Sequence, residues 1–115
     1  MAIDRELQKG STTTLVLSVL SGAPMHGYQM VKELERRSKG LLTFKEGTLY
    51  PVLHTLERDG LIVATWEADG GRERKVYQLT EQGRGELCRR ATEWQEFRAA
   101  VDAVMGGGVV AYAAG

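Results

Sequence analysis

Apolar residues repeat with helical spacing over most of the chain and with strand-like spacing over one short stretch. The helical spacing predicts short helices over residues 11–20, 28–38 and 45–58 and a long one over residues 81–105. Between them, two runs rich in β-branched and aromatic residues flank Asp69-Gly70-Gly71, a sequence typical of a hairpin turn. The pattern therefore predicts a mainly α chain with a small β-hairpin.

The stretch from Lys45 to Ile62 carries the most informative of these helices. Its apolar stripe, which predicts burial, consists of Leu49, Val52, Leu53 and Leu56. The opposite face and its flank are polar or small: Gly47, Thr48, Tyr50, Pro51, His54, Thr55, Glu57 and Arg58. Such hydroxyl, imidazole and guanidinium groups bond well to phosphates and base edges, although an ordinary solvated face is the alternative. Pro51 is expected near the helix start, and Asp59-Gly60 should end the helix.

The two helices before it complete a helix-turn-helix candidate. The run STTTLVLSVL over residues 11–20 is apolar almost all round, which favours a mostly buried helix, with a β-strand as the alternative. The helix over residues 28–38 places Met30, Val31 and Leu34 on one side. Residues 1–10 form a charged lead-in that is a possible helix, and residues 41–44 form an apolar connector that is a possible strand. Two short helices with a brief connection, the second amphipathic, are typical of DNA-reading motifs.

The hairpin that follows has the composition of a basic wing. Arg72, Arg74 and Lys75 lie beside a glycine turn, where positive side chains suit contact with phosphates or the minor groove. A solvated edge kept charged against aggregation is the alternative. Trp66 and Tyr77, one on each strand, are expected to pack on the core.

The long C-terminal helix should begin after Thr80, a suitable cap. At about 1.5 Å per residue, a helix over residues 81–105 approaches 40 Å, too long for this small chain to cover. Leu87, Trp94 and Val101 recur every seven residues, with Ala91, Phe97, Val104 and Met105 in the turns between. This seam predicts a homodimer, and an amphipathic core helix is the alternative. The glycine-rich tail over residues 106–115 is expected to be flexible and dispensable.

Composition and charge limit the functional classes to which the chain can belong. Fifteen basic and fifteen acidic residues cancel, so any argument for nucleic acid must be local. The single cysteine, the absence of a long apolar run and the polar N-terminus predict a cytoplasmic protein with no membrane segment. No catalytic constellation is visible, so the chain is not expected to be an enzyme, and no cofactor or metal is expected. A metal sensor that uses His26, His54 and Cys88 is a weak alternative, because their spacing suits no site on one helix.

Three segments together resemble the PadR family of bacterial transcriptional regulators, in its branch with a short C-terminal domain. They are HGYQMVKELE at residues 26–35, EGTLYPVLHTLERDGLI at residues 46–62 and GGRERKVYQLTEQG at residues 70–83. The resemblance spans roughly residues 10–105. It implies a winged helix-turn-helix domain over residues 1–80, a dimerisation helix over residues 81–105, and repression at a palindromic operator in double-stranded DNA.

The resemblance also implies roles for individual residues. Family members insert the second helix of the motif into the major groove and rest the wing on the backbone or minor groove. Carried over to this chain, the DNA-binding residues are Tyr28, Lys32, Lys45, Thr48, Tyr50, Pro51, His54, Arg58, Arg72, Arg74 and Lys75. Glu73 departs from the family's often unbroken basic wing.

Several relatives in the same branch sense flat hydrophobic compounds at the centre of the dimer. The corresponding effector-binding residues here are Trp94, Phe97, Leu15 and Val101, and the dimer interface would contain Leu87, Ala91, Trp94, Val101, Val104 and Met105. Two facing Trp94 rings can sandwich an aromatic ligand or simply fill the interface. The rival function is a winged-helix module that binds protein instead of DNA.

Overall fold

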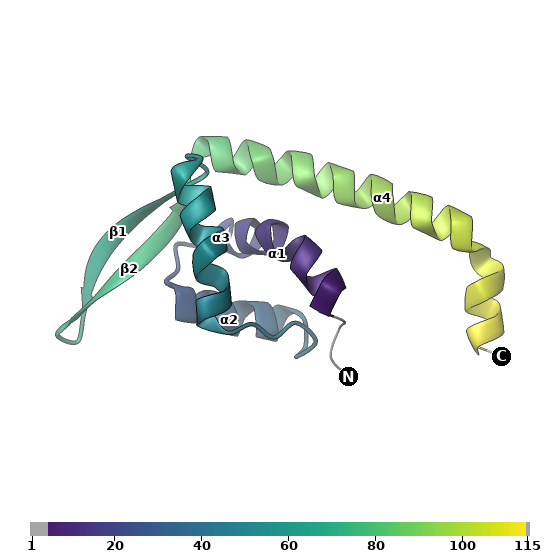
Figure 1. Ribbon diagram of the computed structural model, residues 1–115, viewed down its shortest axis with the longest axis horizontal. Helices are drawn as coiled ribbons and strands as arrows, with labels where there is room; N and C mark the ends of the chain where they lie inside the picture. The colour runs from purple at the N-terminus through teal and green to yellow at the C-terminus, as the bar shows by residue number, and fades with distance from the viewer. Residues whose placement is uncertain (1–4, 115) are drawn as a thin grey trace.

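The computed structural model describes the backbone of residues 5–114 and the side chains of residues 10–106. The elements are α1 (Arg5–Leu20), α2 (Gly27–Arg37), α3 (Glu46–Arg58), β1 (Ile62–Asp69), β2 (Arg72–Leu79) and α4 (Glu81–Ala114). Helices α1 to α3 and the hairpin form a body, from which α4 extends to one side (Figure 1). This mainly helical fold with one antiparallel hairpin is the predicted class.

The core forms where the apolar stripes of the first three helices meet the base of the hairpin. Leu17 of α1, Met30 of α2, Leu49 and Leu53 of α3, and Ile62 of β1 are all fully buried. Each such side chain contributes about 1.5–3 kcal/mol of burial free energy. The burial confirms the apolar stripe predicted for residues 45–58 and the mostly buried helix predicted for residues 11–20, and the strand alternative for residues 11–20 is wrong.

Element boundaries differ from the predictions in four places. Helix α1 already begins at Arg5, within the lead-in. Residues 41–44 are irregular and form no strand. Pro51 lies inside α3, five residues after Glu46, so its missing N–H removes a helical hydrogen bond that a proline at the helix start would not cost. Helix α4 breaks at Gly106, whose φ is 65°, and the chain beyond it is again helical to Ala114. Whether this tail is dispensable stays a prediction.

The hairpin is regular from its base to its tip. Its register runs from Ile62 opposite Leu79 to Asp69 opposite Arg72. Gly70 and Gly71 both have positive φ, 59° and 85°, as a tight two-residue hairpin turn requires. The other edge of β2 pairs with Met25, whose N–H donates to the Tyr77 carbonyl oxygen at 3.0 Å and whose carbonyl accepts from Tyr77 at 2.9 Å. The turn between α1 and α2 is thereby fastened to the wing.

The two aromatic residues of the hairpin have different surroundings. Tyr77 is buried in the core, as predicted. The prediction for Trp66 is wrong, because 65% of its surface is exposed. Trp66 follows Ile62 and Ala64 at the two-residue spacing of a single strand face, but it lies closer to the tip, where the hairpin extends beyond the packed helices (Figure 1).

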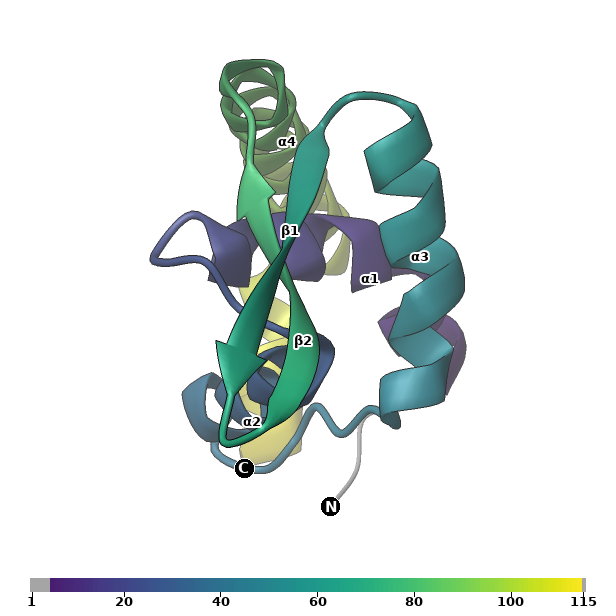
Figure 2. The same cartoon turned by 90° about the vertical axis from the view of Figure 1, so that its left-hand side faces the viewer.

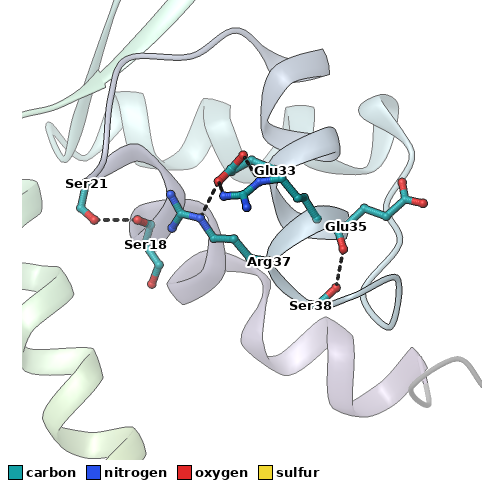
Figure 3. A network of polar contacts seen from close by, with 7 residues as sticks. Ser18, Ser21, Glu33, Glu35, Arg37 and Ser38 are labelled. Carbon is teal, nitrogen blue, oxygen red and sulfur yellow. Dashed lines mark hydrogen bonds and ion pairs between the residues drawn. The ribbon is translucent and has the colours of Figure 1, made fainter.

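Polar contacts fix the surface of α2 and its neighbouring turns. Glu33 accepts hydrogen bonds from Arg36 at 2.5 Å and from Arg37 at 2.7 Å (Figure 3). These bonds lower the pKa of Glu33 from 4.5 to about 2. Ser21 donates to the Ser18 carbonyl oxygen at the end of α1, again in Figure 3. The contacts lie on the outside of the body and leave the core purely apolar there.

The first turn of α4 is anchored to the turn between α3 and β1. The Thr80 hydroxyl donates to the Gly60 carbonyl at 2.7 Å and accepts from the Gly83 N–H at 3.0 Å, which confirms Thr80 as the helix cap. Gly83 is buried so closely that a Cβ there would lie 2.0 Å from the Leu61 carbonyl oxygen. Only glycine fits this contact. The helix therefore leaves the body in a fixed direction.

Beyond its anchored start, α4 leaves the body. The chain measures 57 × 29 × 21 Å, and its radius of gyration of 16.6 Å exceeds the roughly 13 Å expected for a compact chain of this length. Leu87 still packs against the core, but Trp94, Phe97, Val104 and Met105 are exposed. This confirms the prediction that α4 is too long for the rest of the chain to cover.

Candidate nucleic-acid interface

The polar face of α3 is turned to solvent. Thr48, Pro51, His54 and Arg58 are all exposed, whereas the leucine stripe on the other side is buried. Arg58 lies 3.4 Å from Asp59, and both side chains are mostly exposed, so this weak pair leaves the guanidinium available. Lys45, also exposed, stands at the N-cap of α3. The structure thus brings the α3 candidates together on one accessible surface.

Helix α2 fixes the start of α3. His26 caps α2: its N–H donates to the Gln29 side chain at 2.9 Å, and its Nδ1 accepts from the Gln29 N–H at 3.3 Å. The next residue, Gly27, lies against Glu46, the first residue of α3, and a Cβ at Gly27 would be 3.2 Å from the Glu46 carboxylate. Tyr50 donates to the same carboxylate at 3.3 Å. Desolvation, and then the charge of Glu46, raise the pKa of Tyr50.

The two candidates on α2 lie next to each other on its outer surface. The Lys32 ammonium lies 5.3 Å from the centre of the Tyr28 ring, a cation–π distance, and both side chains are exposed. Tyr28 also stacks against His26, with 6.3 Å between the ring centres. The pair therefore presents one cation and one hydroxyl beside the start of α3.

The three wing cations are held to different degrees. Lys75 donates to Glu57 of α3 at 3.1 Å, and this bond raises the pKa of Lys75. Arg74 pairs with Asp69 at 3.0 Å, and its guanidinium lies 3.2 Å from His26. Arg72 is exposed and forms no ion pair with any residue whose side chain the structure describes. Arg72 is thus the cation most ready to meet a phosphate.

Two adjoining hollows lie between the wing and the helices. Figure 2 shows the hairpin beside α3. One, of about 400 Å³, is lined by Tyr28, Glu46, Arg72, Glu73 and Arg74. The other, of about 270 Å³, shares Glu46, Glu73 and Arg74 with the first and adds aromatic and basic side chains, among them Tyr50, Trp66, Lys75 and Tyr77. Tyr28 of α2, Tyr50 of α3 and the three wing cations therefore border these two adjoining hollows.

Sequence reasoning missed three residues of this surface: Glu46, Glu57 and Trp66. Glu57 was assigned only to the flank of α3, yet it ties the wing to that helix. The even spacing of Trp66 from Ile62 indicated its face of the strand, but its burial depended on how far the helices reach along the hairpin.

The residues assigned to the dimer and effector sites are divided between the body and α4. Leu15 and Leu87 pack against the core of their own chain. Trp94 and Phe97 lie together on α4, with 6.1 Å between ring centres, and both are exposed. The remaining candidates on α4 are the half-buried Ala91 and Val101 and the exposed Val104 and Met105.

The described residues contain neither a metal-binding cluster nor a membrane-spanning helix. No group of three or more His, Cys, Asp or Glu side chains among them is arranged to hold a metal ion. None of the helices within the described range is long and apolar enough to cross a membrane.

Residues 16–89 match the Transcriptional regulator PadR-like family, and this range includes the helix-turn-helix, the wing and the anchored start of α4. The chain belongs to this family. PadR-like proteins are transcriptional regulators and not enzymes. The transcriptional regulator Rv3488 of Mycobacterium tuberculosis is 38% identical to this chain over 91 residues. The match covers 77% of this chain and 82% of that protein.

Solved structures of similar proteins have the same fold as this PadR-like chain. A PadR family transcriptional regulator from Eggerthella lenta superposes with a TM-score of 0.78 at 32% identity, over 87% of this chain and 86% of that one. A transcriptional regulator from Clostridium thermocellum gives a TM-score of 0.83 at 24% identity, over 91% and 100% of the two chains. The second likeness bears on the fold alone. Together they confirm the winged helix-turn-helix architecture.

Proposed function

We propose that this PadR-like regulator binds a palindromic operator in double-stranded DNA as a homodimer and represses transcription until a flat hydrophobic compound releases it. The observation that carries the proposal is the exposed polar face of α3 beside a wing that bears three cations. Specific DNA recognition needs both base-reading groups and phosphate-binding groups on one surface, and this surface offers both.

Helix α3 is the recognition helix in this proposal. Its exposed side chains enter the major groove, where Arg58 can bind guanine with two hydrogen bonds and the other groups meet base edges or the thymine methyl. The α3 residues proposed for this contact are Thr48, Tyr50, Pro51, His54 and Arg58, with Lys45 on an adjacent phosphate. Tyr28 and Lys32 brace the backbone from α2, and Arg72, Arg74 and Lys75 meet it from the wing.

Helix α4 provides the dimer interface. An exposed apolar face on a helix that leaves the body is the kind of surface that a second copy covers. The proposed interface contains Leu87, Ala91, Trp94, Val101, Val104 and Met105, with Leu87 contributing least because it already packs on its own core. Dimerisation places two recognition helices near one turn of DNA apart, about 34 Å, which matches a palindrome.

The effector would bind where the two α4 helices meet. Trp94 and its symmetry mate supply two aromatic faces, and Phe97, Val101 and Leu15 are proposed to complete the lining. A bound compound shifts the regulator only if its affinity differs between the DNA-bound and released arrangements. Trp94→Ala should abolish the response to aromatic compounds in a DNA-release assay while operator affinity changes only a few-fold. An unchanged ligand titration would contradict this pocket.

The first test is fluorescence anisotropy with the DNA upstream of the protein's own gene, at about 0.15 M salt and with excess nonspecific competitor. Binding that survives competitor supports a specific regulator. Binding that competitor removes from this and other genomic fragments would favour the protein-binding alternative.

A second test assigns the surface by salt dependence. Arg58→Ala and Lys75→Ala should each weaken binding and reduce the slope of log affinity against log salt by about one. Lys75 should show the smaller loss of affinity, because it must first leave Glu57. Arg89→Ala, which removes an exposed cation from α4, is the matched control and should leave the slope unchanged. If neither wing nor α3 variant alters the slope, the surface is misassigned.

A further inference from the structure

Trp66 occupies an unusual place for a large apolar side chain. It is the most exposed of the aromatic residues whose side chains the structure describes, at 65% of its surface, and yet it lies on the strand face that leads to the core. Because Trp66 lines a hollow together with Tyr50 beside the wing cations, its ring is placed to pack against an apolar part of a bound partner.

Its neighbours connect it to the recognition helix. Trp66 lies directly opposite Lys75 in the hairpin register, and Lys75 is bonded to Glu57 of α3. Trp66 and Tyr50 both line the hollow of about 270 Å³ between the wing and α3. Tyr50 is itself 43% exposed. The Trp66 indole, which is part of the wing, therefore lines the hollow next to α3 and contributes no charge to it.

The charges around this hollow argue against a phosphate inside it. Glu46 and Glu73 oppose Arg74 and Lys75, so the four charged groups that line it cancel at neutral pH. A phosphate gains little from such a neutral lining, whereas an apolar group is not disfavoured. The neighbouring hollow has the same balance, with Glu46 and Glu73 against Arg72 and Arg74. The cations open to a phosphate therefore lie at its border: Arg72, which forms no ion pair with a described side chain, and, over the Tyr28 ring, Lys32.

A DNA strand has the complementary pattern, since charged phosphates alternate along it with apolar deoxyribose rings. We infer that Trp66 packs on a deoxyribose of the strand that crosses from α3 to the wing, while a flanking phosphate reaches Arg72 or Lys32 at the neighbouring hollow. Trp66 thus adds affinity without reading sequence, and it acts by a nonpolar contact that displaces no counterions. The inference rests on the proposed function.

The test is the affinity of Trp66→Ala for operator DNA over a range of salt concentrations. Loss of an aromatic packing contact should weaken binding by roughly tenfold at every salt concentration. The slope against salt should stay unchanged, unlike that of Arg58→Ala or Lys75→Ala. Trp66→Phe should recover most of the loss. Because Trp66 is exposed, all variants should keep the wild-type melting temperature within a few degrees.

The matched control is Val63→Ala on the same strand. Val63 is also exposed, at 49%, and it points to the opposite face of β1, so its removal should not change the affinity. A Trp66→Ala affinity within twofold of wild type would overturn the inference while leaving the proposed function intact. Failure of the wild-type protein itself to bind duplex DNA would overturn both.

Two further measurements exclude an indirect effect through Lys75. In a Lys75→Gln background, Trp66→Ala should cost the same factor as in the wild type, because the two contacts are separate. Disappearance of the effect there would assign Trp66 to holding Lys75 in place. In Trp94→Phe protein, which keeps Trp66 as its single tryptophan, bound DNA should shield the fluorescence from acrylamide. Unchanged quenching with DNA bound would rule out the contact.

Discussion

Helices α3 and α4 differ in how they are exposed: α3 turns one polar face to solvent, whereas residues 92–100 of α4 are exposed on every side and include large apolar side chains among the charged ones. On α3 the leucines are buried within the body and the polar residues are outside. On α4, after Leu87, the exposed residues include Trp94, Phe97 and Val104. A short amphipathic helix gains its stability from its own chain, whereas the outer part of α4 has no cover within the described chain. The contrast separates a surface suited to a charged, hydrogen-bonding partner from one suited to an apolar partner.

The largest effect is expected where α3 is buried. Leu53 is fully buried, so Leu53→Ala should lower the free energy of unfolding by about 2–5 kcal/mol. His54→Ala, on the exposed face of the same helix, should change it by less than about 0.5 kcal/mol. Urea titration of both variants at equal protein concentration makes the comparison. Similar losses in the two variants would contradict the assigned faces.

A smaller loss is expected at the anchored start of α4. In Gly83→Ala the added Cβ meets the Leu61 carbonyl at 2.0 Å, so backbone must shift, and overpacking of this kind costs about 1–3 kcal/mol. Gly85→Ala, where a Cβ meets nothing within 4 Å, should instead stabilise the helix by about 0.5–1 kcal/mol. Thermal unfolding should therefore shift in opposite directions for two substitutions that lie two residues apart.

Substitutions at exposed apolar residues of α4 should change the dimer dissociation constant and leave the stability of the body unchanged. Trp94→Glu places a charge in the proposed interface and should raise the dimer dissociation constant about tenfold or more, roughly 1.4 kcal/mol. Gln95→Glu adds the same charge one residue away, off the seam, and should leave the constant near its wild-type value. Sedimentation equilibrium measures both. Equal dimer strength in the two variants would place the interface elsewhere.

The smallest effect is a pH dependence on the surface of α2. The pKa of Glu33 is lowered from 4.5 to about 2, chiefly by its hydrogen bonds from Arg36 and Arg37. A lowered pKa means that the carboxylate stabilises the fold above pH 4.5 and loses this effect as the pH falls toward 2. Glu33→Gln should therefore flatten the acid side of the stability profile between about pH 5 and 2. Solvent screening of the exposed arginines keeps the change small.

Local patterns were sufficient for much of the fold. The stripe of α3 follows from side chains three and four residues apart, and the hairpin turn follows from two adjacent glycines with positive φ. The Thr80 cap is equally local, since it bonds the N–H three residues later. Each feature depends on neighbours along the chain, so the sequence contains its cause directly.

The missed features depend on where separate elements stop. Trp66 has the spacing of a core residue, but its exposure depends on the hairpin extending past the helices. Position 83 must be glycine because α4 packs against the Leu61 carbonyl there, and this contact between two elements is not visible in the sequence. The tie between Glu57 and Lys75 joins positions 18 residues apart on different elements. The exposure of the polar face of α3 was therefore predictable from the sequence, but the contacts that hold the wing were not.

The close contact at Gly83 fixes the start of α4 against the turn that follows α3. Thr80 and Gly83 join α4 to the turn that ends α3, so the helix cannot tilt without moving that turn. From Glu81 to Met105 the helix is ~37 Å long, and a tilt of ~5° moves its far end by ~3 Å. Conversely, a displacement of ~3 Å at the far end of α4 corresponds to a rotation of ~5° of the body that carries α3. In the proposed dimer, a single glycine would therefore link the spacing of the two subunits to the angle at which each presents α3.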